Sequence, residues 1–163
     1  MFVDDADIAL FFAGWRGFTA AADETLRAEG LGRTDHRVLY VVVRRPGIGV
    51  TELAAALGIT RQALHRPLSA LRRRGLVRAD VPARSGRERA LAATAAGRDL
   101  ERRATGPQLD HIAQVLAAAG PEAMDGWRAV MRGFAAAAVE GLPDAVADLL
   151  EPEGPHDDSA DLR

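Results

Sequence analysis

The chain of 163 residues contains neither cysteine nor lysine. The absence of thiols excludes disulfides, thiolate zinc sites, iron–sulfur ligation and cysteine nucleophiles. No uninterrupted apolar run exceeds six residues, whereas a membrane-spanning helix needs about 20. The first residues are acidic and carry no apolar stretch typical of a secretory signal. From these observations we expect a cytoplasmic protein without a membrane segment.

Charge is strongly segregated along the chain, although its net value is only −2. Residues 1–32 hold two arginines and six acids, residues 33–103 sixteen and six, and residues 104–163 three and eleven. Coding bias can explain why all 21 basic residues are arginine, but it does not explain their clustering. Because the planar guanidinium suits phosphates and guanine edges, the middle of the chain predicts a surface for a polyanion.

Helical periodicity dominates the chain, with a single candidate hairpin. A Gly-Pro pair at 106–107 predicts a kink or break in a long helix. Residues 151–163 are rich in proline and acidic residues, and we expect them to form a mobile acidic tail. The expected helices are 4–29, 34–45 and 51–57 (the last two capped by Thr34 and Thr51), 60–74, one resuming at 94, 122–140 and a short one at 144–150; the expected strands are 76–80 and 88–92, joined by a turn at 82–87.

Two short helices joined by a tight turn form the most informative stretch, at residues 53–68. Ala54 is small enough to let the second helix pass close to the first, and Gly58 permits the positive φ of a sharp turn. The apolar residues expected between the two helices are Ile59, Leu64 and Leu68. This arrangement predicts a helix-turn-helix, in which the second helix enters the major groove of DNA.

The outward face of that second helix carries polar groups without a single acid. Arg61 and Gln62, in its first turn, can pair bidentately with guanine and adenine, and a hydroxyl can hold a phosphate. The alternative is an ordinary solvated face, but such faces normally mix charges of both signs. The positions expected to contact DNA on this helix are Thr60, Arg61, Gln62, His65, Arg66 and Ser69.

The expected hairpin is also basic, with Arg84, Arg87 and Arg89 around its tip. Between residues 60 and 89 there are nine arginines and two acids. Next to a helix-turn-helix, such a hairpin suits the minor groove, and neutralising several phosphates makes binding salt-sensitive. A solvated charged hairpin is the alternative interpretation.

These segments in this order resemble the MarR family of winged helix-turn-helix transcription regulators, over roughly residues 5–140. Two departures from the family pattern are Ser85 in the wing and Pro67 within the second helix, which we expect to be kinked. The matching segments are DHRVL at 35–39, PG at 46–47, VTELA at 50–54, LGITRQAL at 57–64, Leu68, Leu71, GLV at 75–77, RERAL at 87–91 and TAAG at 94–97.

The resemblance implies a mainly helical fold with a small β-hairpin wing, and a homodimer that binds a roughly palindromic DNA operator. Many members of the family are repressors that a phenolic or carboxylated small molecule releases from DNA. The resemblance also implies that residues 1–150 form a single domain. Within it, about 33–97 form the winged helix-turn-helix, and 4–30 and 98–141 form dimerisation helices. The acidic tail at 151–163 lies outside this domain.

An effector cleft is expected between the terminal helices and the DNA-binding part. Trp15, Arg16, His36 and Tyr40 can line it, since cations beside aromatic rings suit an aromatic carboxylate. Alternatively, Trp15 belongs to an interface core and His36 is a satisfied polar group at a helix start.

No cofactor is implied, because the four histidines lack metal-ligand spacing and no nucleophile elbow or phosphate-binding loop occurs. The sequence therefore predicts a DNA-binding transcription regulator rather than an enzyme. The alternative is a winged-helix module that binds an acidic protein instead of DNA.

Overall fold

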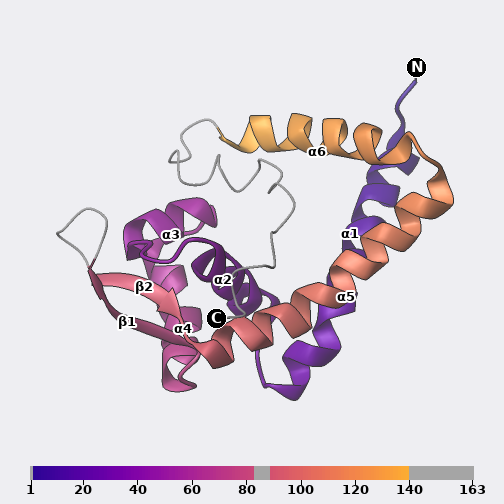
Figure 1. Ribbon diagram of the computed structural model, residues 1–163. Helices are drawn as coiled ribbons and strands as arrows, with labels where there is room; N and C mark the ends of the chain where they lie inside the picture. Colours follow the sequence, from indigo (N-terminus) through magenta and orange to yellow (C-terminus); the bar gives the residue numbers. More distant parts are fainter. Residues whose placement is uncertain (1, 83–88, 140–163) are drawn as a thin grey trace, which may run out of the picture.

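The structure, a computed structural model, describes residues 2–82 and 89–139 (Figure 1). They confirm the predicted mainly helical fold with one antiparallel hairpin. The tip of the expected hairpin at 83–88, the expected helix at 144–150 and the acidic tail lie outside these residues. The elements are α1 (Asp5–Ala28), α2 (Arg33–Arg44), α3 (Val50–Ala56), α4 (Arg61–Arg73), β1 (Val77–Pro82), β2 (Arg89–Ala93), α5 (Ala95–Ala119) and α6 (Ala123–Val139).

Two helices begin two residues earlier than the expected threonine caps place them, with Gly32 and Gly49 at the cap positions. The Asp35 carboxylate accepts the Gly32 N–H at 2.7 Å, so α2 starts at Arg33. In the same way Glu52 accepts the Gly49 N–H at 3.4 Å, and α3 starts at Val50. A carboxylate in the first turn that bonds back to the preceding backbone replaces a hydroxyl cap in both helices.

The two prolines inside helices do not interrupt them. Of the kink or break expected at 106–107, the break does not occur, because α5 continues through Pro107. The helix expected to continue through Pro67 does so, as α4. Pro67 is itself buried, and Pro107 lies between the buried residues Thr105 and Gln108. A proline forfeits one backbone hydrogen bond, and we attribute the continuity of both helices to tertiary packing on either side.

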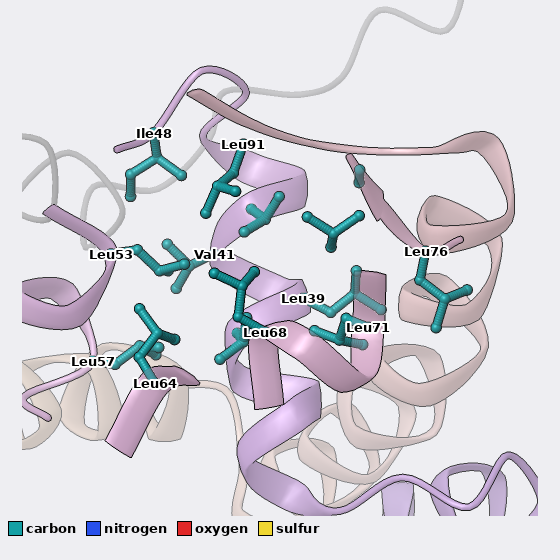
Figure 2. Packing of buried hydrophobic residues seen from close by; sticks show 14 of the residues in the cluster. Leu39, Val41, Ile48, Leu53, Leu57, Leu64, Leu68, Leu71, Leu76 and Leu91 are labelled. Carbon is teal, nitrogen blue, oxygen red and sulfur yellow. The ribbon is translucent and has the colours of Figure 1, made fainter. Parts of the chain in front are cut away.

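The core of the winged helix surrounds α2, whose side chains fill the space between α3, α4 and the hairpin (Figure 2). Four residues of α2 are exposed by 6% or less and form its buried side: Val38, Leu39, Val41 and Val42. A bridge between Ile48 and Leu91 ties the loop after α2 to β2, with the Leu91 N–H donating to the Ile48 carbonyl at 2.9 Å. This bridge holds the hairpin beside the helices.

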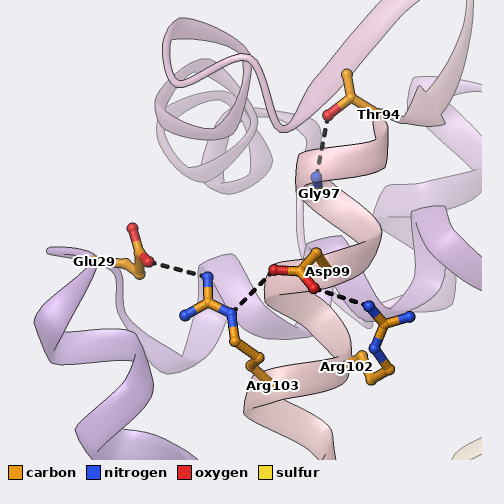
Figure 3. Close-up of polar contacts among 6 residues, drawn as sticks. All are labelled: Glu29, Thr94, Gly97, Asp99, Arg102 and Arg103. Atoms are coloured by element: carbon orange, nitrogen blue, oxygen red, sulfur yellow. Dashed lines mark hydrogen bonds and ion pairs between the residues drawn. The ribbon is translucent and has the colours of Figure 1, made fainter.

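The start of α5 is fixed against the winged helix and against α1 (Figure 3). Thr94 caps α5 by accepting the Gly97 N–H at 3.1 Å. Gly97 packs directly on the Leu76 carbonyl, where a Cβ atom has no room. Further along, Arg103 donates to Asp99 on its own helix and to Glu29 after α1, at 3.1 and 3.2 Å. The long helix therefore runs from the wing along α1.

The N-terminal part of α1 and the C-terminal part of α5 lie away from the winged helix, and α6 begins beside them (Figure 1). Large apolar residues on these three helices are exposed. Phe12 of α1 is 62% exposed and Val130 of α6 is 55% exposed. The rings of Phe11 and Phe134 lie 5.4 Å apart, so the two helices meet at this surface. We call this set the terminal apolar face; it comprises Ile8, Leu10, Phe11, Phe12, Trp15, Val115, Trp127, Val130 and Phe134.

Candidate nucleic-acid interface and adjoining cavity

The turn between α3 and α4 has the geometry of a helix-turn-helix. Gly58 adopts a φ of +64°, as its position predicted. The Ile59 N–H donates to the Ala54 carbonyl at 3.0 Å, which folds the chain back after α3. Thr60 then caps α4, its hydroxyl oxygen accepting the Ala63 N–H at 3.1 Å. This succession of helix, tight turn and capped helix fixes the direction of α4 relative to α3.

The two faces of α4 differ completely. Its inner face is buried against the core and includes the predicted Leu64 and Leu68. Its outer face is exposed and carries no acid, since α4 contains none. Arg61 donates from Nη1 to Thr51 Oγ1 at 3.5 Å, which directs its guanidinium along the side of α3. Among the residues expected to contact DNA, the structure exposes Thr60, Arg61, Gln62, His65 and Arg66, and half-buries Ser69.

The basic hairpin is described only in part. Arg89 begins β2, where its backbone pairs with Pro82 of β1, and its side chain is not described. Arg84 and Arg87 lie outside the described residues. The described part of the hairpin is antiparallel with an irregular register between Arg78 and Val81. The strands that would present the wing are therefore in place, on the same side of α2 as α4 (Figure 1).

A cavity of about 500 Å³ separates the terminal helices from the winged helix. Three of the four residues expected at an effector cleft, Trp15, His36 and Tyr40, line it; Arg16 is exposed and is not among the lining residues. The remaining wall comes from α1 (Phe18, Thr19, Ala22, Leu26), α2 (Arg33, Arg37, Val41, Arg44), the end of α3 (Ala56, Leu57), α5 (Thr105, Gln108, Leu109, Ile112) and α6 (Trp127).

Three arginines of α2 line this cavity, and each has a partner. Arg33 makes a two-pronged ion pair with Asp23 of α1, at 2.9 and 2.6 Å, which lowers the pKa of the Asp23 carboxyl. Arg37 donates to the Leu57 carbonyl at 2.9 Å. Arg44 donates to Glu101 of α5 at 2.7 Å. No aspartate or glutamate is among the lining residues, so the described wall favours an anion.

A chain of hydrogen bonds joins α2 to α5 behind the cavity wall. Thr105 donates its hydroxyl proton to Glu101 at 2.6 Å and therefore accepts from His36 Nε2 at 3.0 Å. Glu101 also accepts a hydrogen bond from Arg44. The guanidinium carbon of Arg44 lies 3.5 Å from the centroid of the Tyr40 ring. Burial lowers the pKa of His36; the Glu101 carboxylate opposes this shift and Arg44 adds to it. His36 is consequently a neutral donor, and the chain runs from His36 to Glu101.

Sequence patterns alone did not identify Arg44, Glu101 and Thr105 as residues of this site. One signal was available: Glu101 and Thr105 are four residues apart and adjoin the buried Leu100 and Ala104, so both fall on the inner side of α5. An acid on a buried helix face requires a partner. The spacing nonetheless does not identify Arg44, which precedes Glu101 by 57 residues.

In the part of the chain that the structure describes, no helix is both long and apolar enough to cross a membrane. Over the same residues, histidines and carboxylates form no group of three or more suited to a metal ion.

Comparison with known proteins agrees with this geometry. Residues 29–88 match the family model described as the MarR family. The chain is 41% identical over 126 residues to the HTH-type transcriptional regulator PetP of Rhodobacter capsulatus, covering 77% of this chain and 75% of PetP. The chain therefore belongs to the MarR family. Its members are DNA-binding transcription regulators and not enzymes.

Solved structures share the fold. The Mycobacterium tuberculosis MarR family protein Rv2887 in complex with DNA has a TM-score of 0.59 at 23% identity, covering 77% of this chain and 94% of that chain. The same protein in complex with salicylic acid has a TM-score of 0.56 at 25% identity, covering 77% and 93%.

Proposed function

We propose that this transcription regulator binds specific sequences of double-stranded DNA as a homodimer on a palindromic operator, and that it is a repressor released by a small aromatic or carboxylate effector. The proposal comprises three separable parts: a DNA-reading surface, a dimer interface and an effector cavity. Each rests on a different feature of the described residues.

The observation that carries the proposal is the exposed, acid-free outer face of α4. We assign base reading to Arg61 and Gln62, which lie in the first turn of α4, where helix-turn-helix proteins contact base edges. Thr60 and Ser69 bind phosphates, and His65 and Arg66 extend the same surface. Arg84, Arg87 and Arg89 complete it as the wing. The DNA complex of a protein with the same fold supports this use of the surface.

The dimer is proposed from the terminal apolar face. Many large apolar side chains, several of them aromatic, are exposed on the same three helices, and exposed apolar patches of this kind mark interfaces. The segments 4–30 and 98–141 form this interface, 33–97 the winged helix-turn-helix, and all belong to one domain at 1–150, followed by the acidic tail at 151–163. In such a dimer two copies of α4 lie about one turn of DNA apart, ~34 Å.

The effector part rests on the cavity. Aromatic rings from Trp15, Tyr40 and Trp127 line it beside three arginines, which suits a flat anion. A salicylic acid complex of a relative with the same fold favours this ligand class. His36 and Arg44 supply its polar wall, while Arg16 is left outside the site.

A gel-shift titration on the promoter DNA beside the protein's own gene, at two salt concentrations, tests the proposal. We expect a shifted species that weakens steeply as salt rises, because phosphate contacts release counterions. No shift even at low salt would favour the alternative, a winged-helix module whose arginine face meets an acidic protein. A thermal-shift series with aromatic acids tests the effector, since a true ligand raises the melting temperature with concentration.

A further inference from the structure

We infer that the ion pair between Arg44 and Glu101 is the contact through which a carboxylate effector acts on DNA binding: the effector takes Arg44 from Glu101 and so releases α2 from α5. This inference rests on the proposed effector cavity and concerns how that cavity regulates the protein. It assigns a coupling role to two residues that analysis of the sequence did not identify.

Arg44 is available to a ligand, whereas its partner is not. Arg44 lines the cavity, and its side chain is 23% exposed. Glu101 is not among the lining residues, and its side chain is 6% exposed. The Tyr40 ring lies against the guanidinium of Arg44, with its centroid 3.5 Å away. An aromatic carboxylate can therefore place its ring beside Tyr40 and its oxygens on Arg44, in direct competition with the Glu101 carboxylate.

The other two cavity arginines are less suited to this competition. Arg33 is held by both oxygens of Asp23, in a fork geometry that a ligand must break twice. Arg37 donates to a backbone carbonyl, so its displacement removes no ion pair. Arg44 alone of the three cavity-lining arginines joins α2 to α5 through a single carboxylate oxygen, Oε1.

Loss of Arg44 leaves Glu101 in an unfavourable state. Its carboxylate remains buried, and among the described residues the Thr105 hydroxyl is then its one remaining donor. A buried carboxylate without a cation is costly, so the packing of α2 against α5 becomes less stable. The His36–Thr105 bond at the other end of α2 belongs to the same chain and shares in that change.

The two helices belong to different functional parts of the protein. α2 is the centre of the winged helix and packs on α4, while α5 extends to the terminal apolar face. A shift between them changes the orientation of α4 relative to the proposed dimer interface. In a dimer that spans two half-sites, such a change alters the spacing of the recognition helices and weakens DNA binding.

The test uses the full chain, with salicylate as the probe ligand. Glu101→Gln keeps the shape of the side chain but removes the charge that competes for Arg44. Glu29→Gln is the matched control, because it makes the same change in the exposed α1–α5 ion pair with Arg103. For each protein, calorimetry gives the salicylate Kd, and fluorescence anisotropy gives the DNA Kd with and without saturating salicylate.

We expect Glu101→Gln to bind salicylate roughly fivefold or more tightly than wild type, the lower end of ordinary coupling between sites. The weakening of DNA binding by salicylate should shrink in the same variant, whereas Glu29→Gln should match wild type in both measurements. Arg44→Gln, a second variant should Glu101→Gln fail to fold, should bind salicylate at least roughly fivefold more weakly.

The outcomes separate this inference from the proposed function. If wild type binds salicylate but Glu101→Gln matches it in both measurements, or Arg44→Gln matches its salicylate Kd, the inference is wrong and the effector cavity stands. If wild type binds no salicylate at millimolar concentration, the effector part of the proposed function fails, and the inference fails with it. DNA binding by α4 is untouched by either result.

Discussion

Nε2 of His36, in the first turn of α2, lies 3.0 Å from Oγ1 of Thr105 on α5, and both side chains are buried. The contact joins residues 69 positions apart in the sequence. Because Thr105 uses its proton on Glu101, His36 must be the donor, and a neutral imidazole with the proton on Nε2 fills that role. Burial disfavours the charged form of this histidine and so lowers its pKa.

Acid is expected to destabilise the protein through His36. Burial lowers its pKa in the folded protein below the ordinary value of about 6.5, so the unfolded chain binds the proton more readily. The free energy of unfolding should therefore fall as pH drops below about 6.5, by at most about 1.4 kcal/mol per pH unit from this group, until the folded pKa is passed.

Urea unfolding from pH 8 to pH 5 measures this effect, with His36→Gln as the comparison. Glutamine stays neutral and can still donate to Thr105, so the variant should lose the histidine's share of the pH dependence. Identical slopes for wild type and His36→Gln would show that His36 does not carry it.

A methyl group at Gly97 is expected to push α5 off the wing. Its Cβ would collide with the Leu76 carbonyl, so Gly97→Ala should lower the free energy of unfolding by about 1–3 kcal/mol. Gly106, on the same helix, has open space around the corresponding position. Gly106→Ala should instead stabilise by about 0.5–1 kcal/mol, through helix propensity. Denaturant unfolding of both variants checks the pair; equal effects of the same sign would contradict this packing.

The terminal apolar face is expected to hold two copies together. Phe12→Asp places a charge on this face and should convert a dimer into monomers, because a buried, unpaired carboxylate is costly. Ala96→Asp introduces the same acid at an exposed position in the first turn of α5 and should leave the dimer intact. Sedimentation velocity distinguishes these states. A dimer that persists in Phe12→Asp would place the interface elsewhere.

Local patterns in the sequence predicted the elements that depend on neighbouring residues. Gly58, Leu64 and Leu68 define the helix-turn-helix because a turn and a helix repeat are short-range features. The continuity of α5 through Pro107 was not predictable in this way, since tertiary contacts override a local helix breaker. The Arg44–Glu101 pair was also missed, because periodicity indicates that a side chain is buried without identifying its partner.

The central claim is that the outer face of α4 reads base sequence, and one comparison tests it most directly. An operator sequence is first selected from random duplexes, and Kd values are then measured for it and for a scrambled duplex at one salt concentration. The proteins are wild type, Arg61→Ala and, as a control of equal charge at the other exposed end of α4, Arg73→Ala.

We expect Arg61→Ala to lose about 1–3 kcal/mol of discrimination between the operator and the scrambled duplex, as for a bidentate contact to guanine. Arg73→Ala should retain the wild-type ratio of the two Kd values. If Arg61→Ala weakens both duplexes equally, or the wild type does not distinguish them, then α4 does not read sequence in the way proposed.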